Sequence, residues 1–298
     1  MNYDSYCIAC LANRQAKLSR KLLGAEMSIS FMKDAARIVA EAPAEVAGAY
    51  LTYKFGELYA KYGVTADLYA QEKKDSNDFV LSVLPQTEKA VAESAEPLKT
   101  ALKFSRIGNF LDFGILDKND VDSHFADDIA GAPELPLDES EYRHLVSDLQ
   151  TAKKLLILGD NAGEIGLDTM LVKELKKQYP GLAVTYCVRG GNALNDATRE
   201  DAAAVGMDRL CAVIDNGLPV PSTEPALLGE ECRRAIAEAD IILSKGQANF
   251  ESLVLSGHNI YYLFLCKCER LCKCLGLPLY TGCFLNERRL PELTPYPG

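Results

Sequence analysis

The pattern of apolar residues divides the chain into two parts. Up to about residue 130, apolar residues recur near helical spacing, as in residues 10–23 and 45–63, which predicts a helical region. A segment rich in Asp, Gly and Pro follows at 117–141, and after it short apolar runs alternate with helical stretches. Apolar runs at 154–158, 183–188, 210–214, 240–244 and 259–265 predict a mostly parallel sheet.

These elements predict an α/β fold with two domains. Residues 1–140 would form a helical domain that contributes to a cleft. Residues 141–298 would form a Rossmann-like, three-layer α/β/α domain that carries the functional site. An aromatic stripe in the helical part has the spacing of a packed helix face, so we interpret it as core and not as a stacking platform. The stripe consists of Tyr50, Tyr53, Phe55, Leu58, Tyr59 and Tyr62.

The first apolar run ends at an Asp-Asn pair, within the sequence LLILGDNAGEIGLD. In an open α/β sheet, ligands bind where strands turn into helices. Asp160 and Asn161 offer oxygen ligands that suit divalent cations, and a helix beginning near Gly163 offers N–H groups that favour an anion. These features predict a metal and phosphate site. Alternatively, Asp160 or Asn161 caps the helix and Glu164 completes a capping box.

Two later turns have the same character. Asn195 and Asp196 follow the second predicted strand, and Lys245 and Asn249 follow the fourth. Because the carboxyl ends of parallel strands meet at one edge of a sheet, we expect these turns to form one site. Lys245 would supply a positive charge for a phosphate group.

Several motifs, in this order, resemble those of the metal-dependent damage-control phosphatase family (ARMT-like), formerly a domain of unknown function. They are GDNAGE, NDAT, SKGQANFE and LCKCE, and the likeness extends over most of the chain. It is greatest for a small, stand-alone microbial branch, whose N-terminal CxxC segment is similar to YCIACL. The segment RIGNFLDFG also resembles a family motif, as does the stretch from Asp67 to Asn77, although Leu68 replaces the usual proline.

The resemblance implies roles for individual residues. Asp160, Asn161 and Asp196 would be the metal ligands and, with Lys267, the catalytic residues. Lys267 would also bind the substrate phosphate, and Lys245 is a second candidate for that contact. Asn109 and Asp112 would extend the substrate site from the helical part of the chain.

The resemblance also implies a cofactor and a substrate class. The cofactor would be one divalent cation, namely Mn²⁺, Ni²⁺, Co²⁺ or Mg²⁺. The substrate would be a small phosphorylated metabolite, such as a sugar phosphate or a damaged or surplus metabolite. Oxygen ligands do not discriminate sharply among these metals.

The net charge of -10 and the pI near 5.0 argue against a protein that binds nucleic acid, because such proteins need a basic face. Neither a signal peptide nor a membrane-spanning run is recognisable, so a cytoplasmic location without a membrane partner is expected. The pattern does not indicate an oligomeric state.

The 10 cysteines are expected to be reduced. Cys7 and Cys10 have the spacing of zinc ligands, and a second cluster spans residues 266–274, but buried, unreactive thiols are favoured. A non-catalytic metal- or ligand-binding module therefore stays an alternative. An S-adenosylmethionine-dependent carboxyl methyltransferase is another, although the first strand is not followed by a GxGxxG loop.

Overall fold

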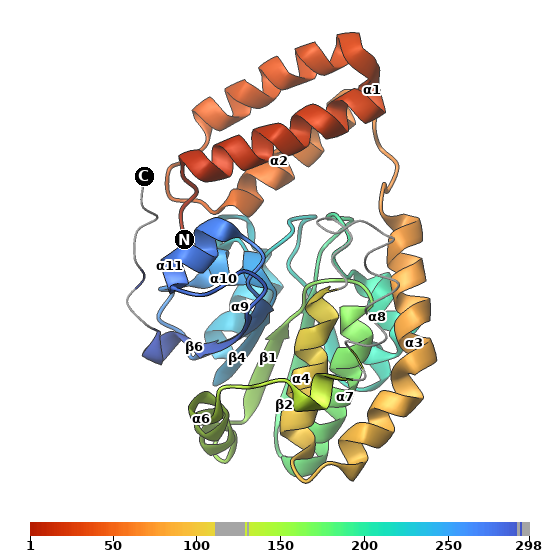
Figure 1. The fold of residues 1–298 in the computed structure, drawn as a ribbon, viewed down its shortest axis with the longest axis vertical. Helices are drawn as coiled ribbons and strands as arrows, with labels where there is room; N and C mark the ends of the chain where they lie inside the picture. The colour runs from red at the N-terminus through yellow and green to blue at the C-terminus, as the bar shows by residue number, and fades with distance from the viewer. Residues whose placement is uncertain (111–128, 130, 291–292, 294–298) are drawn as a thin grey trace.

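A six-stranded sheet forms the centre of the molecule (Figure 1). The computed structural model describes residues 1–110, 129, 131–290 and 293. The strand order is β3-β2-β1-β4-β5-β6, in which β1 to β5 are parallel and β6 runs antiparallel to β5. The strands are β1 (Lys154–Leu158), β2 (Ala183–Val188), β3 (Ala212–Asp215), β4 (Ile241–Lys245), β5 (Ile260–Leu265) and β6 (Gly282–Asn286). The mostly parallel sheet is confirmed, but the antiparallel strand β6 was not among the predicted strands.

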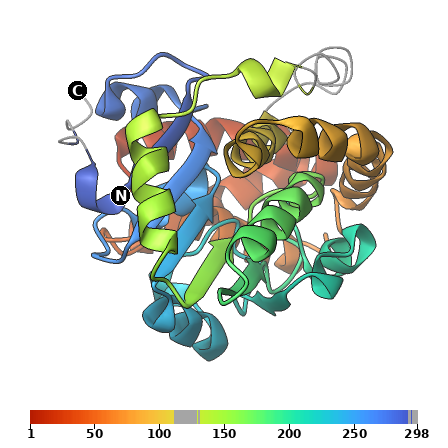
Figure 2. The same ribbon diagram turned by 90° about the horizontal axis from the view of Figure 1, so that it is seen from below.

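Both faces of the sheet are covered by helices (Figure 2). In β1, Leu155 and Ile157 pack on one face and Leu156 and Leu158 on the other, which is why the strand is a continuous apolar run. The first face is covered by α3 (Ala70–Glu93), α4 (Pro97–Ile107), α6 (Glu139–Leu149), α7 (Glu164–Gln178) and α8 (Arg199–Val205). The second is covered by α9 (Glu230–Glu238), α10 (Gln247–Leu253) and α11 (Glu269–Leu275). The three-layer α/β/α arrangement is confirmed.

The N-terminal region is helical, as predicted. Helix α1 (Ser5–Glu41) folds back on itself at Gly24, where the backbone is not helical, and α2 (Gly48–Lys61) packs against it. We call α1 and α2 together the helical hairpin; it lies above the carboxyl edge of the sheet (Figure 1). The hairpin has its own core, in which the Phe31 and Tyr59 rings stack with their centroids 4.3 Å apart. Phe55 and Tyr59 of the aromatic stripe are buried in this core, which agrees with the packing interpretation.

The hydrophobic core is not divided at residue 140. The predicted boundary falls near the start of α6, but Val80 of α3 and Leu102 of α4 belong to the same apolar cluster as Ile157 of the sheet. Short 3-10 helices lie at Gly108–Phe110 (η1) and Ala132–Glu134 (η2). Helices α3 and α4 therefore belong to the helical layer on the first face of the sheet. No helix in the described ranges has the combined length and apolarity required to span a membrane.

Candidate functional site

The turns that follow β1 and β2 are joined to each other at the carboxyl edge. Asn161 and Asp196 form an isolated antiparallel bridge, and the N–H of Ala197 donates to the carbonyl of Asp160 at 2.7 Å. Asp160, Asn161 and Asp196 are all buried residues. The fold thus gathers the three residues expected to hold a metal.

These residues do not cap the helices that follow them. The N-cap of α7 is Gly163, which lacks a side chain, and α8 is capped by a box formed by Thr198 and Asp201. The capping interpretation of Asp160 and Asn161 is therefore wrong. No side-chain hydrogen bond caps the start of α7.

Arg189, which directly follows β2, links the two carboxylates. Its Nε donates to Asp196 Oδ2 at 2.5 Å, and its Nη2 lies 3.5 Å from Asp160 Oδ1. Burial disfavours the charge on this guanidinium, but Asp196 and Asp160 outweigh that effect and raise the pKa of Arg189. Our sequence analysis missed this residue. Its position at the carboxyl end of an apolar strand was the signal that could have identified it.

Gly246, at the carboxyl end of β4, leaves room for Asp160. Its φ is +78°, and a Cβ there would come within 2.0 Å of Asp160 Oδ2. Residue 246 thus needs to be glycine both for its backbone conformation and for the space that it leaves. The turn after β4 thereby sets the position of the Asp160 carboxylate.

Asn109, in η1, connects the helical part of the chain to the site. Its Nδ2 donates to Asp160 Oδ2 at 2.8 Å and to Glu164 Oε2 at 3.1 Å. Its Oδ1 accepts from the N–H of Leu265 at 3.2 Å, and its carbonyl accepts from Lys267 Nζ. Asn109 and Lys267 therefore lie at the site, whereas their contacts with a substrate stay predictions. Asp112 is outside the described residues.

Lys245 lies beneath the site and is fully buried. Its Nζ donates to Glu164 Oε1 at 2.6 Å, to Asp168 Oδ1 at 2.8 Å and to the carbonyl of Ser105 at 3.1 Å. Three acceptors match the three N–H donors of an ammonium group. This geometry favours a supporting role for Lys245, and its predicted contact with phosphate stays a prediction.

Burial and neighbouring charges shift the pKa values of Asp168 and Lys245. Burial raises the pKa of Asp168, although Lys245 opposes the shift. Burial disfavours the charge on Lys245, but Asp168 and Glu164 outweigh it and raise the pKa of Lys245. Lys245 is therefore held as a cation that fixes Glu164, whose Oε2 in turn accepts from Asn161 Nδ2 at 3.1 Å.

Helix α3 forms hydrogen bonds and an ion pair with the segments that follow β1 and β2. Asn77 Oδ1 accepts from the N–H of Gly163 at 2.7 Å, and Asn77 Nδ2 donates to Asp201 Oδ1 at 2.9 Å. Lys73 Nζ pairs with Asp201 Oδ2 at 2.8 Å. Lys73 and Asn77, which resembled a family motif, thus connect the helical region to both turns.

The donor set is suitable for a divalent cation. Asp160 and Asp196 supply carboxylates. Asn161 supplies an amide, whose Nδ2 donates to Asp160 and Glu164. Hard cations prefer such oxygen donors. The absence of a side chain at residue 246 allows the Asp160 carboxylate to lie in this position. The residues present therefore fit the metal that the resemblance implies.

The cysteines do not form a comparable centre. All 10 are free thiols, and Cys266 and Cys272 approach to 2.7 Å between their Sγ atoms. Within the described part of the chain, no cluster of at least three His, Cys, Asp or Glu residues is arranged to hold a metal; the candidate site differs in combining two carboxylates with the amide of Asn161. This finding favours the interpretation of the cysteines as thiols over a cysteine zinc site.

Comparison with known proteins places this geometry in a family. A family model for the damage-control phosphatase ARMT1-like domain matches residues 4–281. A damage-control phosphatase of Archaeoglobus fulgidus is 34% identical over 215 residues, which cover 71% of this chain and 73% of the relative. A damage-control phosphatase of Pyrococcus horikoshii is 27% identical over 287 residues, which cover 93% of this chain and 96% of the relative.

A solved structure has the same fold. The crystal structure of a DUF89 family protein from Pyrococcus horikoshii superimposes with a TM-score of 0.78 at 24% sequence identity, covering 96% of this chain and 99% of that chain. The family match spans nearly the whole sequence, including the turns that carry Asp160 and Asp196. The chain therefore belongs to the damage-control phosphatase ARMT1-like family.

Proposed function

We propose that this protein is a metal-dependent phosphatase that hydrolyses small phosphorylated metabolites. One divalent cation would bind to Asp160, Asn161 and Asp196. The observation that supports this proposal best is the joining of two turns at the carboxyl edge, which brings these three oxygen donors together above Arg189. Relatives named damage-control phosphatases support the reaction class and suggest damaged metabolites as substrates.

A bound divalent cation would polarise a phosphoryl oxygen and favour a water molecule as the nucleophile. The protein contributes the orientation of the ligands. Arg189 and Asn109 donate hydrogen bonds to Asp160, and Arg189 also donates to Asp196. Such bonds fix the direction of the carboxylates and typically affect metal affinity when they are removed.

Lys267 is the proposed phosphate-binding residue. It follows β5, its backbone N–H donates to Gln247 Oε1 at 2.9 Å, and its Nζ reaches the carbonyl of Asn109, a residue that contacts Asp160. Lys267 is half-buried, in contrast to Lys245, and it is linked to the proposed metal ligand Asp160 through Asn109. A cation in this position stabilises the charge on the phosphoryl oxygens during transfer, a step governed by positioning and electrostatics.

Hydrolysis of p-nitrophenyl phosphate by metal-stripped protein tests the proposal. Mg²⁺, Mn²⁺, Co²⁺, Ni²⁺ and Zn²⁺ would be added back one at a time to the wild type and to Asp196→Ala. We expect turnover with at least one of the first four ions in the wild type and its loss in Asp196→Ala, because the substitution removes a ligand.

Asp215→Ala is a matched control. Asp215 also ends a parallel strand at this edge, but its Oδ2 pairs with Arg199 at 2.7 Å, outside the site. This variant should retain metal-dependent turnover. Wild-type protein that hydrolyses neither this ester nor any member of a phosphometabolite panel with any metal would contradict the proposal and favour the non-catalytic binding module.

A further inference from the structure

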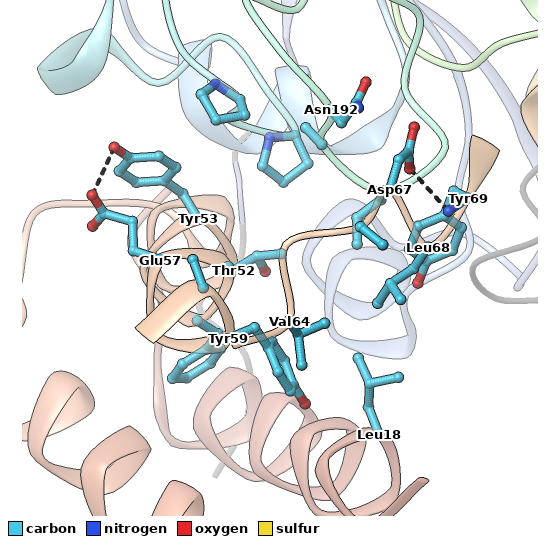
Figure 3. A pocket seen from close by; sticks show the side chains of 18 of the residues that line it. Leu18, Thr52, Tyr53, Glu57, Tyr59, Val64, Asp67, Leu68, Tyr69 and Asn192 are labelled. Carbon is cyan, nitrogen blue, oxygen red and sulfur yellow. Dashed lines mark hydrogen bonds between the residues drawn. The ribbon is translucent and has the colours of Figure 1, made fainter. Parts of the chain in front are cut away.

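A cavity of ≈ 520 Å³ lies between the helical hairpin and the loops that follow β2 and β3 (Figure 3). The described residues that line it include Leu18 of α1 and Leu194 of the loop after β2, but none of the three proposed metal ligands. The groups that fix the direction of these ligands are therefore to be sought among their buried neighbours in the α/β unit. Helix α7 begins with Glu164, three residues after Asn161, and supplies one of them.

Glu164 contacts two asparagine side chains with one carboxylate oxygen. Its Oε2 accepts from Asn161 Nδ2 at 3.1 Å and from Asn109 Nδ2 at 3.1 Å. The backbone N–H of Asn161 also lies 3.4 Å from this oxygen. Glu164 is fully buried, so these bonds are formed in a medium of low dielectric constant, where they are stronger than in water. The carboxylate thus joins a proposed metal ligand to the short helix η1.

These contacts determine which way the Asn161 amide faces. An asparagine amide donates from Nδ2 and accepts at Oδ1, whereas an ionised carboxylate only accepts. Asn161 therefore turns its NH2 group toward Glu164, and its Oδ1 lies on the other side of the amide. Divalent cations bind the oxygen of an amide and not its NH2 group. The orientation that Glu164 requires is thus the one in which Asn161 can be a metal ligand.

Lys245 and Gly108 hold Glu164 in this arrangement. Lys245 Nζ, which can only donate, lies 2.6 Å from Glu164 Oε1. The ion pair thereby occupies Oε1 and leaves Oε2 to the asparagines. From η1, a Cβ on Gly108 would come within 2.9 Å of both Cα and Cγ of Glu164, so the two backbones pack closely. The ion pair and the packing together fix the position of the Glu164 side chain.

We infer that Glu164 is a positioning residue, which orients the Asn161 amide so that its oxygen faces the proposed cation. The inference rests on the proposed function, because it concerns the same metal site. Glu164 itself does not bind the cation, since Lys245 occupies one of its oxygens and the two asparagines occupy the other. It acts through Asn161 by allowing only one of the two amide orientations.

Glu164→Gln tests this role, because it exchanges one acceptor for a donor at nearly constant size. Lys245 can only donate, so the oxygen of the introduced amide stays with Lys245 and the new NH2 group faces Asn161. Two donors then oppose each other, and Asn161 relieves the conflict by turning its oxygen toward residue 164. We expect the affinity for Mn²⁺, measured by calorimetry on metal-stripped protein, to fall about 10–100-fold.

Asn161→Asp, added to Glu164→Gln, should rescue metal binding. A carboxylate presents an acceptor on both sides, so one oxygen accepts from the introduced NH2 group and the other faces the cation. Because a new carboxylate by itself attracts cations, Asn161→Asp alone is the reference, in which two buried carboxylates repel each other. We expect Asn161→Asp to raise the Mn²⁺ affinity at least about tenfold more in the Glu164→Gln background than in the wild type. The melting temperature of the metal-free protein should rise with Asn161→Asp in the first background and fall in the second.

Asp168→Asn is the matched control for a purely structural effect. Asp168 is the other buried carboxylate that pairs with Lys245, at 2.8 Å. Its remaining side-chain bonds are with Ser105 and Tyr186, and within the described ranges it contacts none of the proposed metal ligands. This variant also removes a charge from the buried network, but it should bind Mn²⁺ as the wild type does.

The outcomes separate the positioning role from the proposed function. Wild-type Mn²⁺ affinity in Glu164→Gln, or an equal loss in Asp168→Asn, would overturn the positioning role and leave the phosphatase intact. Independent effects of the substitutions at residues 161 and 164 would do the same, because an orienting contact requires them to be coupled. A wild-type protein that binds none of Mn²⁺, Mg²⁺, Co²⁺ and Ni²⁺ would overturn the metal-dependent phosphatase and the positioning role together.

Discussion

Gly246 lies against Asp160 so closely that a Cβ on residue 246 would come within 2.0 Å of Asp160 Oδ2. The two residues follow β1 and β4, which are neighbours in the sheet although 86 positions separate them in the chain. This is the point at which the strand order reverses, where open α/β sheets bind ligands. The backbone of one turn therefore limits where the carboxylate of the other can lie.

Gly246→Ala should reduce metal-dependent turnover strongly, because the methyl group displaces the Asp160 carboxylate. Metal affinity, measured by calorimetry, should fall about 10–100-fold, as for loss of a group that orients a metal ligand. Gly257→Ala is the control for backbone strain, since Gly257 has a φ of +82° and a Cβ added there would meet no atom within 4 Å. The two variants should lose similar stability from strain, and only Gly246→Ala should lose metal affinity. Equal activity in both would show that the contact with Asp160 is unimportant.

Arg189→Met should destabilise the metal-free protein by about 3–5 kcal/mol, because it leaves the buried carboxylates of Asp160 and Asp196 without their cation. A divalent cation supplies charge at the same place, so saturating Mn²⁺ should raise the melting temperature of Arg189→Met by more than that of the wild type. Thermal unfolding with and without metal measures both effects. A smaller metal-induced shift in the variant than in the wild type would argue against a cation at these carboxylates.

Lys245 and Lys267 should differ in what their loss affects. Lys245→Met leaves Glu164 and Asp168 buried without their cation and should destabilise the protein by about 3–5 kcal/mol in urea unfolding. Lys267→Met alters a half-buried residue, so the fold should persist while kcat falls about 10²–10³-fold, as when a group that stabilises transition-state charge is removed. Wild-type stability with weakened phosphate binding in Lys245→Met would instead make Lys245 the phosphate ligand.

Stability should decrease in alkali. The pKa of Lys245 is raised above 10.5 because its carboxylate partners outweigh burial, and that of Tyr186 is raised well above 10.0 by burial and by Asp168. The native state thus holds these protons more tightly than the unfolded chain does. Their stabilising contribution is complete below the unfolded pKa values and is lost as the pH rises through the folded ones. Urea midpoints should therefore fall from about pH 10 upward.

Tyr186→Phe tests the source of this alkaline loss. The Tyr186 hydroxyl donates to Asp168 Oδ2 at 2.6 Å, so the variant removes one of the shifted groups from the buried network. Its urea midpoint should be lower than that of the wild type at neutral pH and should fall less steeply in alkali. An identical pH dependence in the two proteins would exclude Tyr186 as a contributor.

Much of the fold could be predicted because the buried strands are continuous apolar runs. The runs at 154–158 and 183–188 coincide with β1 and β2. The other runs differ from β3 and β4 at both ends and from β5 at its start, by one or two residues each. Strand β6 lacked such a signal, because its short sequence, GCFLN, is only partly buried and does not form a continuous apolar run. The continuity of the core across residue 140 was also hidden, since helical spacing shows that a face is apolar and not what it packs against.

The sequence by itself determined the helical and α/β regions and the turns that carry Asp160, Asn161 and Asp196, because these features depend on local periodicity and on residues next to strand ends. Only the tertiary structure decided that Arg189 joins two carboxylates and that Lys245 is buried with Glu164 and Asp168. These relationships join residues distant in the chain. Their energies depend on burial and on which charges become neighbours, and neither can be inferred from a linear pattern.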